Sequence, residues 1–96
     1  MKFEMQILNI FVLLYEETLF VGIIKNRPQR LITQCCCELR IDGKVHQVIE
    51  FSGERMIQKY PDSEENLCTI ATIKGFHVQL TSEQAQTGMW KLVCIS

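Results

Sequence analysis

Five cysteines and two histidines carry most of the reactive chemistry in this sequence of 96 residues. Three of the cysteines, Cys35, Cys36 and Cys37, are adjacent in the stretch ITQCCCELR. Thiols and imidazoles bind zinc and copper, thiols form disulfides, and a thiolate can act as a nucleophile. Because five is an odd number, at least one thiol stays unpaired or bonds a second chain.

The spacing of these residues predicts neither a metal site nor a catalytic site. No Cys-x-x-Cys or His-x-x-x-His pair occurs, and adjacent cysteines on a strand face opposite sides. His46 and His77 alternate with apolar neighbours, as surface residues of strands do. A nucleophilic cysteine needs a base, and the sequence has no Gly-x-Ser-x-Gly motif and no evident carboxylate pair. We therefore expect no enzyme activity, no metal and no cofactor.

The elements that would position these residues are strands. The length predicts one domain covering residues 1–96, and an apolar content of 47% is typical of a globular protein. Runs of β-branched and aromatic residues, separated by turn-forming residues, favour an all-β sandwich or barrel. The expected strands are Met5–Leu14, Thr18–Lys25, Leu31–Ile41, Val45–Phe51, Leu67–Ile73, Phe76–Leu80 and Met89–Ile95.

Two connections between the strands are expected to be helical. Gly53–Tyr60 contains good helix formers and stops before Pro61. Thr81 and Gln84 have the spacing of a capping box, which would begin a short turn.

Residues 1–22 allow two interpretations. Lys2 and the apolar run after it resemble the basic start and apolar middle of a secretory signal. Glu4 and Asn9 interrupt that pattern, no small-x-small cleavage site follows, and the run is too short to span a bilayer. The segment is either a degenerate signal peptide or the first strand or helix of the domain.

Strand alternation gives a first interpretation of the triple cysteine. In a strand over Leu31–Ile41, Cys35 and Cys37 face the core, whereas Cys36 faces solvent together with Ile32. Cys36 is thus a candidate exposed thiol. In an oxidising compartment it could bond a second copy of the chain, and an uncovered edge strand could pair with one.

The next turn tests this alternation. Asp42 and Gly43 are a strong signal for a two-residue hairpin loop. That loop would mix polar and apolar side chains on both faces, whereas a three-residue loop that includes Lys44 keeps the apolar sets in phase. We therefore predict a three-residue loop with a bulge. In that register Ile41 lies opposite Val45, Cys37 opposite Ile49 and Cys35 opposite Phe51.

The C-terminal third of the chain resembles an immunoglobulin-like domain. Such domains often end with an apolar alternating strand, a polar corner and the motif Asp-x-Gly-x-Tyr/Trp-x-Cys. Cys68–Ile73 alternates, Gly88 and Trp90 fit the motif, and Cys94 follows on the face of Trp90. Gln86 stands at the acidic position, and Cys94 comes two residues late. The resemblance implies a small immunoglobulin-like sandwich of about seven strands.

The resemblance also implies a core disulfide that ends at Cys94. Alternation puts Cys35 and Cys37 on the core face, and we expect Cys37, before Cys35, to lie near Cys94 across the core. A cross-link that closes a loop of this size is worth roughly 4 kcal/mol in the chain-entropy model. Cys68 would pair with one of the remaining cysteines or stay a buried thiol.

The expected function is that of a non-enzymatic protein-binding module, secreted or on the cell surface. The alternative is an intracellular, cytoplasmic structural or assembly protein with reduced cysteines. A net charge of −1 gives no general attraction to nucleic acid or anionic membranes, and no small-molecule substrate is evident. The expected partner is another protein or a second copy of the chain. Candidate binding-loop residues are Lys25, Arg27, Arg30, Asp42, Lys44, Asp62, Glu64 and Glu65.

Overall fold

The structure is a computed structural model that describes residues 2–26, 31–55 and 67–95. Within these ranges the chain forms six strands, one short 3-10 helix and one short α-helix. In chain order they are β1 (Glu4–Val12), the 3-10 helix η1 (Leu14–Glu16), β2 (Thr18–Lys25), β3 (Cys35–Ile41), β4 (Lys44–Glu54), β5 (Leu67–Thr72), α1 (Ser82–Ala85) and β6 (Trp90–Cys94).

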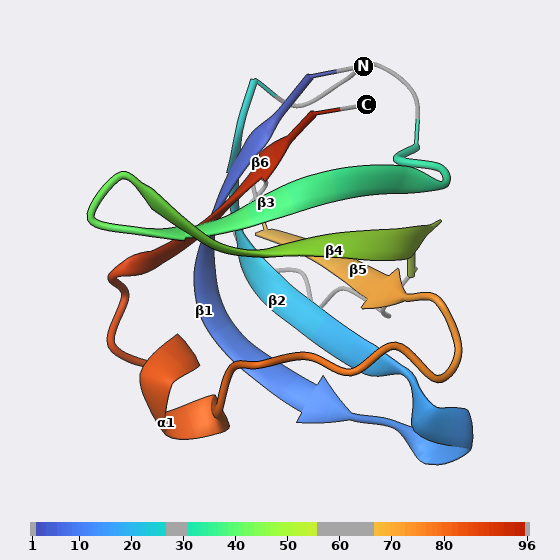
Figure 1. The fold of residues 1–96 in the computed structure, drawn as a ribbon. Coiled ribbons are helices and arrows are strands. Elements are labelled where there is room, and N and C mark those ends of the chain that lie inside the picture. The colour runs from blue at the N-terminus through green and yellow to red at the C-terminus, as the bar shows by residue number, and fades with distance from the viewer. Residues whose placement is uncertain (1, 27–30, 56–66, 96) are drawn as a thin grey trace.

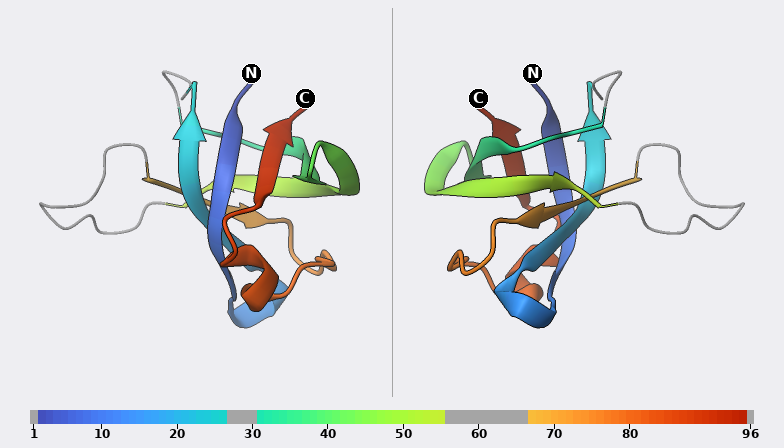
Figure 2. Two further views of the ribbon diagram at one scale, coloured as in Figure 1. Left: turned by 90° about the vertical axis from the view of Figure 1, so that its left-hand side faces the viewer. Right: turned by 90° about the vertical axis from the view of Figure 1, so that its right-hand side faces the viewer.

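The six strands form one antiparallel sheet that closes into a barrel (Figure 1). Their order around the barrel is β1-β2-β5-β4-β3-β6, and β6 returns to pair with β1. The side views show the strands wrapping around one interior (Figure 2). The prediction of a β-rich domain is therefore confirmed. The sandwich with seven strands is not confirmed, because one sheet closes on itself.

Three β-bulges help the sheet to curve. The extra residues are Leu8 in β1 and His46 and Ser52 in β4, where the register with the neighbouring strand shifts. A bulge bends its strand and increases the local twist, which is how a sheet of few strands closes. Leu8 is the reason why Ile7 and Ile10, three positions apart, both face the interior.

The barrel interior is filled with apolar side chains from all six strands. The rings of Phe20 and Phe51 pack edge to face, with their centroids 5.3 Å apart. Trp90 and Leu92 are buried on β6, as the alternation predicts. The first strand supplies a large share of this core, with Met5, Ile7 and Ile10.

The β3–β4 hairpin differs from the prediction at its loop. Ile41 lies opposite Lys44, so the loop has two residues, and both have positive φ: 50° at Asp42 and 76° at Gly43. This is the backbone that an Asp-Gly sequence favours. The bulge at His46 then restores the in-phase register. Consequently the pairs Cys37 with Ile49 and Cys35 with Phe51 are as predicted, and the three-residue loop and the pair Ile41 with Val45 are wrong.

The expected strand Phe76–Leu80 does not form. This segment crosses beside β4 and is held by a side chain instead of a strand ladder. The amide of Gln47 donates to the carbonyl of His77 at 2.7 Å and accepts from the backbone N–H of Gln79 at 2.8 Å. His46 contacts the carbonyl of Gln79 through Nε2, at 3.0 Å, and packs edge-on against Trp90.

The two helical predictions have different outcomes. The capping box is present: Thr81 Oγ1 accepts from the N–H of Gln84, and the Gln84 side chain accepts from the N–H of Thr81. Gly53 and Glu54, in contrast, belong to strand β4, and residues 56–60 of the expected helix Gly53–Tyr60 lie outside the described residues. The 3-10 helix η1 was not expected.

Candidate functional site

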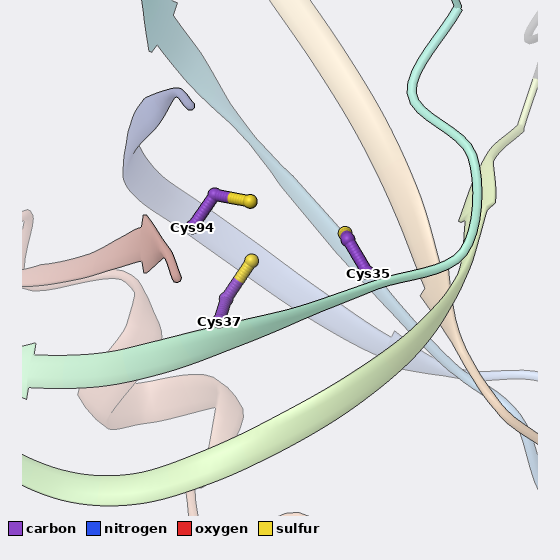
Figure 3. A group of neighbouring side chains, drawn as sticks. All are labelled: Cys35, Cys37 and Cys94. Atoms are coloured by element: carbon purple, nitrogen blue, oxygen red, sulfur yellow. The ribbon is translucent and has the colours of Figure 1, made fainter. Parts of the chain in front are cut away.

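The structure brings three of the five cysteines together inside the barrel. Cys35 and Cys37 are two positions apart on β3, so both point inward, and Cys94 on β6 lies opposite Cys37. The three sulfur atoms all lie within 4.8 Å of one another. Figure 3 shows the sulfurs of Cys37 and Cys94 pointing into the barrel on the side of Cys35. We call these three residues the thiol cluster.

Cys37 and Cys94 form a non-hydrogen-bonded pair of the antiparallel ladder. The neighbouring pair carries the hydrogen bond, from the N–H of Ile95 to the carbonyl of Cys36 at 2.9 Å, while the N–H of Cys94 turns to Phe3 on the other side at 3.0 Å. Residues in such pairs have Cα atoms about 4.5 Å apart. A disulfide is possible at that spacing.

No disulfide is present, although all five cysteines lie within the described ranges. Cys94 lies beside Cys37 in the same wall of the barrel, and the prediction that it lies across the core is wrong in that respect. Cys68 is buried on β5, opposite Gly22, and does not belong to the thiol cluster.

Hydrogen bonding within the thiol cluster separates the acidity of its members. A hydrogen bond from Cys37 lowers the pKa of Cys35, although burial acts in the opposite direction, and Cys94 adds a smaller lowering effect. The same hydrogen bond raises the pKa of Cys37 far above its ordinary value, and burial and the charge of Cys35 add to this. The shared hydrogen bond and the burial therefore oppose ionisation of both thiols at the same time.

A depression lies on the outer face of the barrel at the start of β3. It has a volume of about 240 Å³ and is lined by Gln34, Cys35, Cys36 and Glu50. Cys36 faces outward, as predicted, but is half-buried, and it lies opposite Glu50 in the ladder. The depression is thus a surface feature beside Cys36, whereas the side chain of Cys35 is buried in the core.

A second feature is an apolar surface at the connection between β1 and β2. The side chains of Phe11, Val12, Leu13 and Leu14 are 50%, 80%, 38% and 82% exposed. We call these four residues the apolar tip. It lies at the end of β1 near the bottom of Figure 1. Contiguous exposed apolar side chains of this kind mark interaction surfaces.

A hollow adjoins the apolar tip, and hydrogen bonds hold the tip's backbone in place. The hollow, about 430 Å³, is lined by Phe11 and Val12 together with residues next to and within helix α1. The N–H of Leu13 donates to the carbonyl of Glu17 at 2.7 Å, and the N–H of Gly75 donates to the carbonyl of Glu16 at 3.1 Å. The tip is therefore an ordered surface next to a groove.

The charged groups beside the apolar tip are of both signs. Glu16 is exposed, and Glu17 forms an ion pair with Arg55. Amphipathic surfaces that bind anionic membranes instead carry lysine and arginine around their apolar side chains.

The three candidate binding-loop residues that the structure describes do not gather at one place. Lys25, Asp42 and Lys44 are exposed, but Lys25 pairs with Glu4 at the end of the β1–β2 hairpin that is far from the apolar tip. Asp42 and Lys44 flank the β3–β4 turn on another side of the barrel. The remaining five, Arg27, Arg30, Asp62, Glu64 and Glu65, lie outside the described residues.

The surface around Cys36 also differs from the prediction. Ile32 is buried, because residues 31–34 precede strand β3 and do not continue its alternation. Strand β3 has β4 on one side and β6 on the other, so it is not an edge. His46 and His77 are exposed, as predicted.

The sequence correctly predicted that Cys37 and Cys35 lie near Cys94, but it predicted neither a metal-binding arrangement of the three sulfurs nor the apolar tip. The Cys-x-x-Cys spacing that indicates a metal site is typical of turns. Cys35 and Cys37 instead have the Cys-x-Cys spacing, which places both side chains on one face of a strand. The sequence pattern predicts that Phe11–Leu14 belong to a buried strand or to a signal peptide. An indication of the apolar tip was available, since four consecutive apolar residues break the period of two that a half-buried strand requires.

Comparison with protein-family models, with curated proteins and with solved structures found no match for this chain. The resemblance to immunoglobulin-like domains therefore stays a prediction. Among the described residues, no helix has the length and the apolar character needed to cross a membrane.

Proposed function

We propose that this protein is a non-enzymatic protein-binding module that contacts its partner through the apolar tip. The observation that carries the proposal is the exposure of four consecutive apolar side chains, two of them, Val12 and Leu14, at 80% and 82%. Water contact with such a surface is unfavourable, and covering it with a partner recovers that free energy.

The architecture limits how a partner could bind. The sheet closes, so pairing with the edge of the barrel is a weak option. The charges beside the apolar tip are mixed, since Arg55 pairs with Glu17, and they do not form the basic rim of a surface that binds anionic membranes. An apolar protein surface with a polar rim is the partner that fits the apolar tip best.

The second candidate is an intracellular structural or assembly protein with reduced cysteines. It is supported by the five thiols, none of them in a disulfide, and by the role of β1. Cleavage near residue 20 would remove a strand that pairs with both β2 and β6 and supplies Met5, Ile7 and Ile10 to the core. The proposal of a secreted, immunoglobulin-like binding module is supported instead by the match of Gly88, Trp90 and Cys94 to the motif of that family.

Aspartate substitutions in the apolar tip test the proposal. The full chain is immobilised and exposed to an extract of the cells that produce it, alongside the variants V12D and L14D. V48D is the matched control, because Val48 is an exposed valine on β4, away from the tip. We expect wild type and V48D to retain the same partner in stoichiometric amount, and both tip variants to lose it.

Sedimentation of the purified chain over a wide concentration range shows whether a second copy is the partner. In that case self-association should disappear in L14D and persist in V48D. The proposal is wrong if the tip variants keep every interaction of the wild type. Binding to anionic vesicles that L14D abolishes would instead make the apolar tip a membrane contact.

A further inference from the structure

We propose that the thiol cluster is a binding site for one thiophilic metal cation of the class of Cu(I), held by the sulfurs of Cys35, Cys37 and Cys94. This inference is independent of the proposed function, because the thiol cluster lies inside the barrel and shares no residue with the apolar tip.

The distances between the sulfurs suit a metal ion. Three sulfurs that each lie about 2.3 Å from a central ion are about 4 Å from one another. The sulfurs of the thiol cluster are already within 4.8 Å of one another. A contraction of less than about 1 Å, within the reach of side-chain rotation, would complete the coordination.

The type and number of ligands select the metal. Thiolates are soft ligands that favour Cu(I), zinc and iron–sulfur clusters. A structural zinc site takes four ligands in a tetrahedron, and within the described ranges the group consists of these three sulfurs alone. The three-sulfur site therefore favours a soft cation that is stable with three ligands, and Cu(I) is the biological cation of that kind.

Burial adds to this preference. Cys35, Cys37 and Cys94 are 4%, 0% and 5% exposed, so a bound ion would have little contact with water. Exclusion of water removes the competing oxygen ligands that a harder cation needs to complete its shell. It would also shield Cu(I) from oxidants in solution.

Metal binding at the thiol cluster balances without a redox step. Each sulfur that binds exchanges its S–H bond for an S–Cu bond and releases one proton to solvent. At most three protons leave per ion, copper stays Cu(I), and no oxidant or reductant takes part.

The competing chemistry is a disulfide between Cys37 and Cys94, whose ladder positions permit it. That reaction uses two of the sulfurs and leaves Cys35 alone. The cation uses all three sulfurs. A disulfide between Cys37 and Cys94 does not require the sulfur of Cys35 to lie close to the other two, whereas a metal site does. Metal binding would also protect Cys37 and Cys94 from oxidation. A metal site therefore predicts that added Cu(I) slows formation of the disulfide, whereas a simple disulfide pair predicts no such effect.

The test is an anaerobic titration of the reduced full chain with Cu(I), in competition with the chelator bicinchoninate. We expect one ion per chain, a near-ultraviolet thiolate-to-copper absorption band, and three sulfurs at about 2.3 Å by X-ray absorption. Cys35→Ser, Cys37→Ser and Cys94→Ser should each weaken binding at least about 100-fold. The controls are C36S, outside the barrel, and C68S, buried but not in the thiol cluster.

Circular dichroism of each metal-free variant separates loss of the site from loss of the fold, and the X-ray absorption of the wild type stands even if one variant does not fold. The proposal is overturned if the wild type takes up no Cu(I) against the chelator, or if C36S abolishes binding while the cluster variants retain it. It is also overturned if a mild thiol oxidant links Cys37 to Cys94 equally fast with and without one equivalent of Cu(I). A preference for Zn(II) over Cu(I) would reject the assigned class.

Discussion

Replacing Gly22 with alanine should strongly destabilise the barrel. Gly22 lies on β2 opposite Ile7, and a Cβ atom added there would come within 2.2 Å of the backbone oxygen of Gln6 and 2.8 Å of Met5 Cγ. The first of these contacts is with backbone, which moves only if the β1–β2 ladder moves. Overpacking of a core costs about 1–3 kcal/mol, occasionally more. A clash with backbone places G22A at the upper end, about 3 kcal/mol or above.

Gly43 provides a matched glycine with the opposite properties. A Cβ there meets nothing within 4 Å, but the residue has a φ of 76°. The expected cost of G43A is only the strain of a left-handed residue, about 1–2 kcal/mol. Urea denaturation followed by the fluorescence of Trp90, the one tryptophan, measures both variants. In a thermal melt, about 3 kcal/mol corresponds to a drop of roughly 12 °C or more.

The comparison separates crowding from backbone strain. We expect G22A to lose more free energy of unfolding than G43A, by about 1 kcal/mol or more. If G22A is as stable as the wild type, β1 and β2 are not in the described contact and the closure of the barrel through β1 is refuted.

Three further predictions follow from individual contacts. Gln47→Ala removes both hydrogen bonds to the Phe76–Leu80 segment. It should lower the free energy of unfolding by about 1–2 kcal/mol and speed hydrogen exchange at the N–H of Gln79. Unchanged exchange at that N–H would contradict the role of Gln47 in holding the segment. Thr81→Ala breaks the capping box and should lower the free energy of unfolding by about 1 kcal/mol. Thr81→Ser keeps the hydroxyl and should retain most of that stability. Equal stability of the Ala and Ser variants would contradict the capping role. A maleimide should label Cys36 first in the native protein, because the other four cysteines are buried. In urea it should label all five. Mass spectrometry counts the labels, and rapid labelling of Cys37 in the native protein would contradict its burial.

The register of the hairpin shows what sequence patterns can predict here. Keeping apolar side chains in phase correctly placed Cys37 opposite Ile49 and Cys35 opposite Phe51. It placed the bulge in the loop, however, and the chain instead uses the Asp42 and Gly43 turn and puts the extra residue at His46. The hydrophobic pattern fixes the phase of two strands, but several loop and bulge combinations give the same phase.

The closure of the sheet and the placement of Cys37 beside Cys94 in one wall of the barrel could not be predicted from the sequence, for a related reason. Alternation shows that Cys35, Cys37 and Cys94 face the interior, but it does not show which strands are neighbours. The pairing of β3 with β6, two elements far apart in the chain, decides that Cys37 meets Cys94 side by side. The segment Phe76–Leu80 alternates like a strand, yet the amide of Gln47 takes its backbone hydrogen bonds, and side-chain clamps of this kind have no sequence signature.

Site-specific photocrosslinking tests the central claim, that the apolar tip is the surface that binds a partner protein, most directly. A photoreactive amino acid replaces Leu14 in one form of the full chain and Val48 in the control form, and each is irradiated in the cells that produce the protein. We predict a single prominent crosslinked partner from position 14 and none from position 48. Crosslinks of equal yield from both positions, or none from position 14 while the chain is folded, would contradict the claim.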